Sequence, residues 1–257
     1  GSQDPDSGMV TYFQGNRPGY AKLYCTPQDS FWCCTGSGME SHAKYGDSIY
    51  FHDGAGLTVN LFIPSLLNWR QMGAVITQQT SFPDQPGTRL SIGLKKPRSF
   101  ALNLRHPGWS RQAVVRVNGE EVVRSDAPGR YLVVERQWRD GDQVELQLDM
   151  SVRAVPLPTE ASIFALMVGP ILLAGAFGNT GMPAGSDIVV NERKYGDYLP
   201  EPFAVPRLKG TPVAIAGLLK PGSAPLTFTV PDSAGGTVRL MPYMRIHHQR
   251  YVTYWQV

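Results

Sequence analysis

The chain has 257 residues, of which 42% are hydrophobic and 18% are charged, and its formal net charge is +3. This composition is typical of a globular chain and excludes intrinsic disorder, while the length allows one large domain or two or three smaller ones. The excess positive charge is dispersed and forms no basic run, so we expect no nucleic-acid partner. The longest apolar run, Ala161–Phe177, is interrupted at Gly169-Pro170. It predicts a buried strand rather than a membrane span.

Short apolar or alternating segments, separated by turn residues, follow one another through most of the chain and are typical of β-strands. Asn118-Gly119 predicts a tight hairpin, since both residues tolerate positive φ. The predicted strands are Met9–Phe13, Ala21–Cys25, Leu57–Ile63, Ala74–Thr80, Arg89–Leu94, Ser99–Arg105, Ala113–Val117, Glu121–Arg124, Tyr131–Glu135, Val144–Leu148, Leu226–Val230 and Thr237–Met241. Evenly spaced short strands predict antiparallel β-sandwich domains, with a seam near Pro156-Leu157-Pro158.

One helix is predicted, over Met39–Tyr45, directly after a Gly-Ser-Gly turn. A single helix ahead of a β-rich chain indicates that its helical neighbours are absent. The polar, turn-rich start, Gly1–Gly8, is open to two interpretations: native loop, or a remnant added before Met9.

Cys33 and Cys34 are adjacent, follow the aromatic pair Phe31-Trp32 and precede the glycine turn. Adjacent cysteines bridge each other only with strain, and three cysteines do not make a disulfide framework. A helix N-terminus lowers a cysteine pKa, and the thiolate is both a nucleophile and a metal ligand. Spacing alone favours a buried thiol pair over a metal site.

Other polar and aromatic residues have simpler interpretations. Glu40 follows the turn on the predicted helix, where a carboxylate favours the positive end, so we expect solvation or packing rather than acid/base catalysis. We expect His42 and His52 to be polar surface or hydrogen-bonding residues, and Cys25 to be structural or incidental. Phe31 and Trp32 form either a sugar-stacking platform or part of the core.

The run Cys33–Tyr45, followed by Asp47–Phe51, closely resembles the end of the catalytic domain in the β-L-arabinofuranosidase family, glycoside hydrolase family 127 and its relatives. The preceding segment, from Thr11 to Trp32, is also similar to that family. So are Val168-Gly169-Pro170 with its apolar flanks and the closing segment Tyr243–Tyr251. The resemblance therefore runs nearly end to end.

The resemblance implies an α/α barrel followed by β-sandwich domains. On that basis we divide the chain into residues 1–50, the end of the barrel domain, and two sandwich domains at 51–155 and 156–257. In the family the barrel holds a zinc ion bound by a glutamate and three cysteines. By motif matching, Cys33 takes the position of the nucleophile and of a zinc ligand, and Cys34 that of a second zinc ligand.

The remaining ligands and the acid/base glutamate lie upstream in the family. The resemblance therefore implies the C-terminal portion of a retaining, zinc-dependent hydrolase of β-L-arabinofuranosides. Its partners would be an arabinose-containing glycan and the missing barrel portion of the same protein, and we expect the isolated chain to be inactive. In a retaining glycosidase a thiolate with a lowered pKa can replace the attacking carboxylate, and zinc deprotonates a coordinated thiol outright.

Two alternative functions belong to other classes of protein. The first is a non-catalytic carbohydrate-binding or scaffold module. The second is a thiol-based redox or metal-handling protein, against which the absence of a C-x-x-C spacing counts. The exact sugar, the linkage and the compartment stay open.

Overall fold

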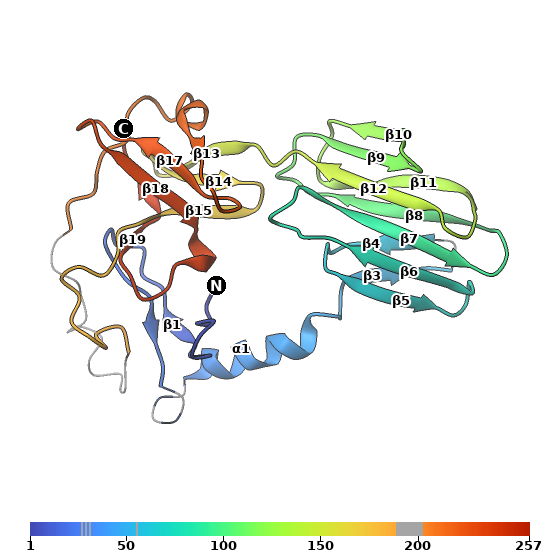
Figure 1. Cartoon of the computed structure of the whole chain (residues 1–257), viewed down its shortest axis with the longest axis horizontal. Coiled ribbons are helices and arrows are strands. Elements are labelled where there is room, and N and C mark those ends of the chain that lie inside the picture. Colours follow the sequence, from blue (N-terminus) through green and yellow to red (C-terminus); the bar gives the residue numbers. More distant parts are fainter. Residues whose placement is uncertain (27, 29, 31, 55, 189–202) are drawn as a thin grey trace. The chain divides into compact units, whose positions relative to one another are not determined.

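The structure is a computed structural model that describes residues 1–26, 28, 30, 32–54, 56–188 and 203–257. Its contacts divide the chain into two compact units (Figure 1). Unit 1 combines Gly1–Ala43 with Val152–Val257, and unit 2 is Lys44–Ser151. The mainly β fold predicted from the sequence is confirmed. The division into residues 1–50, 51–155 and 156–257 stays a prediction.

Unit 2 contains two sheets, one of four strands in the order β11-β8-β4-β3 and one of six in the order β10-β9-β12-β7-β6-β5. The strands are β3 (Tyr50–His52), β4 (Gly56–Val59), β5 (Ser65–Trp69), β6 (Ala74–Gln79), β7 (Gly87–Leu94), β8 (Arg98–His106), β9 (Ala113–Val117), β10 (Glu120–Ser125), β11 (Arg130–Trp138) and β12 (Gln143–Leu148). Neighbouring strands are antiparallel except β4 and β8, which are parallel. Between β4 and β8 the chain forms β5, β6 and β7 of the six-stranded sheet. Such a crossover connection permits a parallel pair.

The sandwich of unit 2 follows from the alternation of buried and less buried residues along several of its strands, such as β6, β7 and β8. In β8, Phe100, Leu102 and Leu104 are buried, while the residues between them are only partly covered. Inward side chains from both sheets form one buried cluster. Within it the rings of Trp69 and Phe100, from opposite sheets, meet edge to face at 5.2 Å between centroids. Trp138 is fully buried and donates from Nε1 to the carbonyl of Phe100 at 3.0 Å.

Unit 1 carries a two-stranded sheet, of β1 (Thr11–Phe13) and β2 (Leu23–Tyr24), and one of eight strands. The eight are β13 (Val152–Leu157), β14 (Glu160–Val168), β15 (Ile171–Ala176), β16 (Lys220–Pro221), β17 (Phe228–Pro231), β18 (Thr237–Pro242), β19 (Tyr251–Val252) and β20 (Tyr254–Trp255). The short 3-10 helices η2 (Ile215–Leu218) and η3 (Tyr243–Arg245) lie within this region.

The closing segment is inserted between two neighbouring strands of unit 1. β19 pairs with the end of β15, and β20 pairs with the middle of β14. Trp255 is thereby fully buried. A Cβ at Gly175 would lie 2.5 Å from Trp255 Cη2, so only glycine permits this approach.

The strand predictions differ from the structure at three places that matter for the fold. The strand predicted over Leu57–Ile63 ends at Val59, because the amides of Asn60 and Leu61 turn to the carbonyl of Ile49. β5 was not predicted. β13 was also missed and runs through Pro156, which lay in the predicted seam. β13 is the edge strand of its sheet, where a missing N–H is tolerated.

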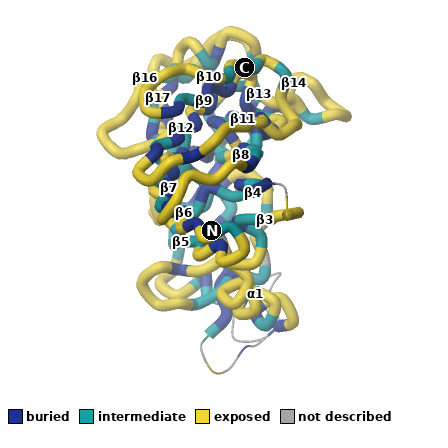
Figure 2. Tube along the Cα trace, turned by 90° about the vertical axis from the view of Figure 1, so that its right-hand side faces the viewer, coloured by how far each residue is buried: buried dark blue, intermediate teal, exposed yellow. Residues whose placement is uncertain are grey.

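The helix prediction was too short. α1 covers Cys33–Lys44 and includes the glycine segment that the sequence predicts as a turn. Glycine costs a helix about 1 kcal/mol relative to alanine, but the amides of Thr35 and Gly36 bond to the carbonyl of Trp32 and start the helix at Cys33. Thr35 is the one residue of α1 that is buried; the rest of the helix is exposed or nearly so (Figure 2). No helix among the described residues is long and apolar enough to cross a membrane.

Candidate functional site

The two adjacent cysteines lie in the first turn of α1, and both thiols are exposed. Their sulfur atoms are 4.0 Å apart, and Cys33 Sγ lies 3.9 Å from the hydroxyl of Tyr12. The thiol of Cys33, as a hydrogen-bonding neighbour, raises the pKa of the Cys34 thiol. The lowered pKa expected from a helix N-terminus is therefore not found at Cys34.

A small cluster of buried residues packs beside this turn. Leu23, Cys25 and Trp32 form it, and the ring of Tyr12 packs against Trp32 at 5.5 Å between centroids. Burial in this cluster favours the structural alternative for Cys25, and Trp32 belongs to the core rather than to an open platform. Phe31, the other candidate for such a platform, lies outside the described residues. Tyr12 was not singled out by sequence reasoning. The only signal for it was its place in the Thr11-Tyr12-Phe13 segment of the family resemblance.

The thiol pair fits part of a zinc site. Two thiolates on one tetrahedral zinc, each with a Zn–S bond of about 2.3 Å, lie about 3.8 Å apart, close to the 4.0 Å separation of the two sulfurs. No group of three or more His, Cys, Asp or Glu side chains suited to a metal occurs among the described residues. Among these described residues, the buried hydroxyl of Thr35 has no hydrogen-bond partner. The turn therefore offers two sulfur ligands, which is fewer than zinc needs. The Thr35 hydroxyl beside them is left without a hydrogen bond to any described residue.

The remaining predicted residues do not join the thiol pair. Glu40 and His42 are exposed on α1, as expected for solvated residues. His52 is exposed in unit 2, with its ring 6.0 Å from that of Trp69.

The sequence of the closing segment predicts a strand there, on which the adjacent side chains of His247 and His248 would point to opposite faces and could not easily share a metal. This prediction is wrong. The two histidines lie in the loop after η3, and His248 has a φ of +52°, which breaks the alternation. Both contact Tyr24: its hydroxyl lies 2.7 Å from His247 Nδ1, and its ring stacks on that of His248 at 4.7 Å between centroids.

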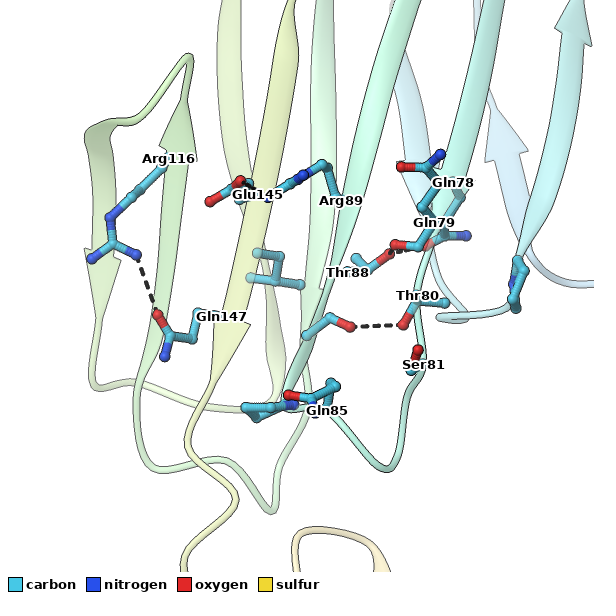
Figure 3. A pocket seen from close by; sticks show the side chains of 14 residues that line it. Gln78, Gln79, Thr80, Ser81, Gln85, Thr88, Arg89, Arg116, Glu145 and Gln147 are labelled. Atoms are coloured by element: carbon cyan, nitrogen blue, oxygen red, sulfur yellow. Dashed lines mark hydrogen bonds and ion pairs between the residues drawn. The ribbon is translucent and has the colours of Figure 1, made fainter. Parts of the chain in front are cut away.

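A polar depression of about 790 Å³ lies along β6, β7 and β12 of unit 2 (Figure 3). Its charged and polar groups are bonded to one another: Arg89 Nη2 is 2.6 Å from Glu145 Oε1, and Arg116 donates to Gln147 at 3.2 Å. None of its 14 lining residues is aromatic. It therefore offers no stacking surface for a sugar ring.

The fold of the chain is similar to part of three solved glycoside hydrolase structures. It matches a glycoside hydrolase with a TM-score of 0.69 and 18% identity, covering 99% of this chain and 46% of the other. A GH127 β-L-arabinofuranosidase from Geobacillus stearothermophilus matches with a TM-score of 0.62 and 22% identity, covering 91% and 38%. A GH127 β-arabinofuranosidase matches with a TM-score of 0.64 and 21% identity, covering 100% and 43%. The chain thus spans less than half the length of these structures.

Comparison with models of protein families identifies the family of the chain. The profile of the GH127 β-L-arabinofuranosidase catalytic domain matches residues 1–47, and that of the GH127 middle domain matches residues 56–150. A domain of unknown function matches residues 153–257. The comparison with curated proteins gave no match. The chain belongs to the glycoside hydrolase family 127-like proteins, as the sequence resemblance predicts.

Proposed function

We propose that the chain is the C-terminal portion of a zinc-dependent, retaining glycoside hydrolase that acts on β-L-arabinofuranosides in arabinose-containing glycans. The observation that carries the proposal is the pair of exposed sulfurs 4.0 Å apart at the start of α1, within a segment that matches the catalytic-domain profile. The identity to the solved structures is too low to transfer their activities, so the substrate is inferred from the family.

Cys33 is the proposed nucleophile. Its sulfur attacks the anomeric carbon, the bond from that carbon to the leaving oxygen breaks, and the leaving oxygen takes a proton from a general acid. Water then releases the sugar, so the anomeric configuration is retained. A bound zinc would supply the positive charge that keeps thiols deprotonated at neutral pH. Cys33 and Cys34 would hold it, and Tyr12 would orient Cys33 through its hydroxyl 3.9 Å away.

This chain supplies only part of the machinery. Two thiolates are too few for zinc, which takes three or four protein ligands, and Glu40 is solvated on the exposed helix. We propose that the other ligands and the general acid come from further residues of the same protein, and that this chain alone turns over no substrate.

The test compares this chain with the complete protein of its gene on an aryl β-L-arabinofuranoside. We expect no release of the aryl group by the chain, and zinc-dependent release with retained configuration by the complete protein. Cys33→Ser should reduce the complete protein's rate at least a thousandfold, and Cys34→Ser should reduce its zinc content. Zinc-dependent hydrolysis by the chain alone, or full activity of the Cys33→Ser protein, would overturn the proposal.

The same cysteine variants distinguish this proposal from the two alternative functions. A carbohydrate-binding or scaffold module would bind glycan equally well after both cysteines are replaced by serine. A redox protein would show thiol exchange at Cys33 and no effect of glycan.

A further inference from the structure

One histidine joins two buried carboxylates that are far apart in the sequence of unit 1. His248 Nδ1 lies 2.5 Å from Asp187 Oδ2, and His248 Nε2 lies 3.1 Å from Asp4 Oδ2. The Asp4 and Asp187 side chains are 3% and 10% exposed, and the His248 side chain is 41% exposed. The arrangement therefore connects the beginning, the middle and the end of unit 1 through one ring.

Asp4 belongs to a well-bonded N-terminal hairpin. The Asp4 amide donates to the Met9 carbonyl at 2.8 Å, and the Gly8 amide donates to the Asp4 carbonyl at 2.9 Å. The Asp4 carboxylate accepts from the amides of Asp6 and Ser7 and from the hydroxyl of Ser7. A contact made to the Asp4 carboxylate therefore holds the whole hairpin rather than a loose terminus.

The other partners of His248 lead to the thiol pair. Tyr24, whose ring stacks on His248, donates its amide to the carbonyl of Asp187 at 2.7 Å. It lies in β2 opposite Thr11 of β1. The next residue, Tyr12, has its hydroxyl 3.9 Å from Cys33 Sγ. His248 thus supports, through β1 and β2, the tyrosine beside the candidate nucleophile.

We propose that His248 is a protonation-dependent clamp that holds the N-terminal hairpin, and with it β1 and Tyr12, to the C-terminal sheet of unit 1. Only the protonated imidazole donates from both ring nitrogens, so both carboxylates are bound together only by the cation. The proposal concerns the clamp itself and does not depend on the glycosidase assignment.

The groups around His248 favour this cation. Burial disfavours the charge, but hydrogen bonds and charges of Asp187 and Asp4 outweigh it and raise the pKa of His248. Burial also disfavours an ionised Asp4, but bonds from Ser7, His248 and the Asp6 amide outweigh it and hold the pKa of Asp4 far below its usual range. Tyr24 faces the ring from one side with a raised pKa caused first by burial, so it is a neutral phenol.

The neighbouring His247 does not compete for this charge. Burial and the Lys22 ammonium lower the pKa of His247, and its Nδ1 is bonded to the Tyr24 hydroxyl. Lys22 itself is buried, with its pKa lowered to about 8, and donates to the carbonyls of Gly1 and Tyr243.

The signs of the two shifts define a pH window. A raised histidine pKa adds stability that is complete below the ordinary value of about 6.5. That stability is lost as the pH rises through the raised pKa of His248. A lowered aspartate pKa adds stability that is complete above about 3.9 and is lost as the pH falls. The clamp is therefore strongest between about pH 4 and pH 6.5.

The experiment measures hydrogen exchange and thermal unfolding of this chain and of His248→Gln, each at pH 5.5 and at pH 9. At pH 5.5 we expect the amides of Gly8 and Tyr24 to exchange at least tenfold faster in the variant, and the Tm to fall by roughly 3–8 °C. At pH 9 both differences should shrink to less than half. His42→Gln, at an exposed histidine outside the clamp, is the matched control and should leave the pH dependence of Gly8 and Tyr24 protection unchanged.

Asp187→Asn provides a second test if His248→Gln fails to fold. It keeps a hydrogen-bond acceptor but removes one charge, and should reduce the pH dependence of Tyr24 protection without exposing the hairpin at pH 9. Equal pH dependence in the wild type and in whichever variant folds, or unchanged protection of Gly8 and Tyr24 at pH 5.5, would overturn the clamp.

Discussion

At the level of single residues, the candidate site consists of two sulfurs and the groups that hold them. Cys33 and Cys34 share the first turn of α1, which places their side chains close to each other despite their adjacency in sequence. The buried Trp32 anchors that turn, and Tyr12 approaches Cys33 from β1. A hydroxyl from another element therefore lies beside the Cys33 sulfur.

We predict that Tyr12→Phe slows alkylation of Cys33 by iodoacetamide at pH 7 about fivefold, the value of one hydrogen bond of about 1 kcal/mol. The hydroxyl 3.9 Å from Cys33 Sγ can donate to the thiolate, and phenylalanine cannot. Peptide mass spectrometry after timed labelling distinguishes Cys33 from Cys34. Tyr45→Phe, at an exposed tyrosine just after α1, is the control; an equal effect there would show that the Tyr12 contact is irrelevant.

At the level of elements, α1 buries little of its surface against the part of the chain that the structure describes. It has 12 residues, and Thr35 is the one that is buried. Isolated helices of about 12–15 residues or fewer are marginal in water, and Gly36 and Gly38 weaken this one further. Met39 and Tyr45 are 55% and 57% exposed, on the helix and just beyond it. In this chain the segment that carries the thiol pair is therefore held mainly at its first turn.

We predict that Gly38→Ala stabilises α1 by about 1 kcal/mol, because alanine favours the helix and the new Cβ would meet only Val10 Cγ1, at 3.6 Å. Hydrogen exchange of the Met39–Lys44 amides should slow about fivefold. The contrasting variant is Gly175→Ala, where the Cβ would lie 2.5 Å from a buried tryptophan ring. It should destabilise unit 1, and the prediction fails if both substitutions act in the same direction.

At the level of the whole molecule, each unit has its own buried core. The large cluster of unit 2 draws on both of its sheets, and unit 1 has smaller clusters, one of them around Tyr251 and Ile246. Contacts within each unit are dense enough to separate them as compact bodies. Each core then sets the stability of the unit that contains it.

We predict that Trp138→Ala destabilises unit 2 by about 3–5 kcal/mol, the usual cost of truncating a buried tryptophan. Native-state hydrogen exchange in low urea should show lost protection in β8 and β12 and unchanged protection in β14 and β15. Val133→Ala, at a position in β11 that is 55% exposed, should change stability by less than about 0.5 kcal/mol. Equal loss of protection in both units would contradict independent cores.

The sequence by itself was sufficient for the fold class, for most strands of unit 2 and for the family. Alternation in segments such as Ser99–Arg105 and the Asn118-Gly119 turn are local signals, because a strand's period and a hairpin's φ angles are properties of neighbouring residues. The Cys33–Tyr45 run was likewise specific enough to point to glycoside hydrolase family 127.

Only the tertiary structure decided how distant segments meet. The parallel pairing of β4 with β8, the edge position that lets β13 contain Pro156, and the start of α1 at Cys33 depend on partners outside each segment. The same holds for Tyr12 beside Cys33 and for His248 between Asp4 and Asp187. These contacts join residues 21, 61 and 244 positions apart, and no local pattern encodes a proximity that arises only when sheets pack and a positive φ turns a side chain.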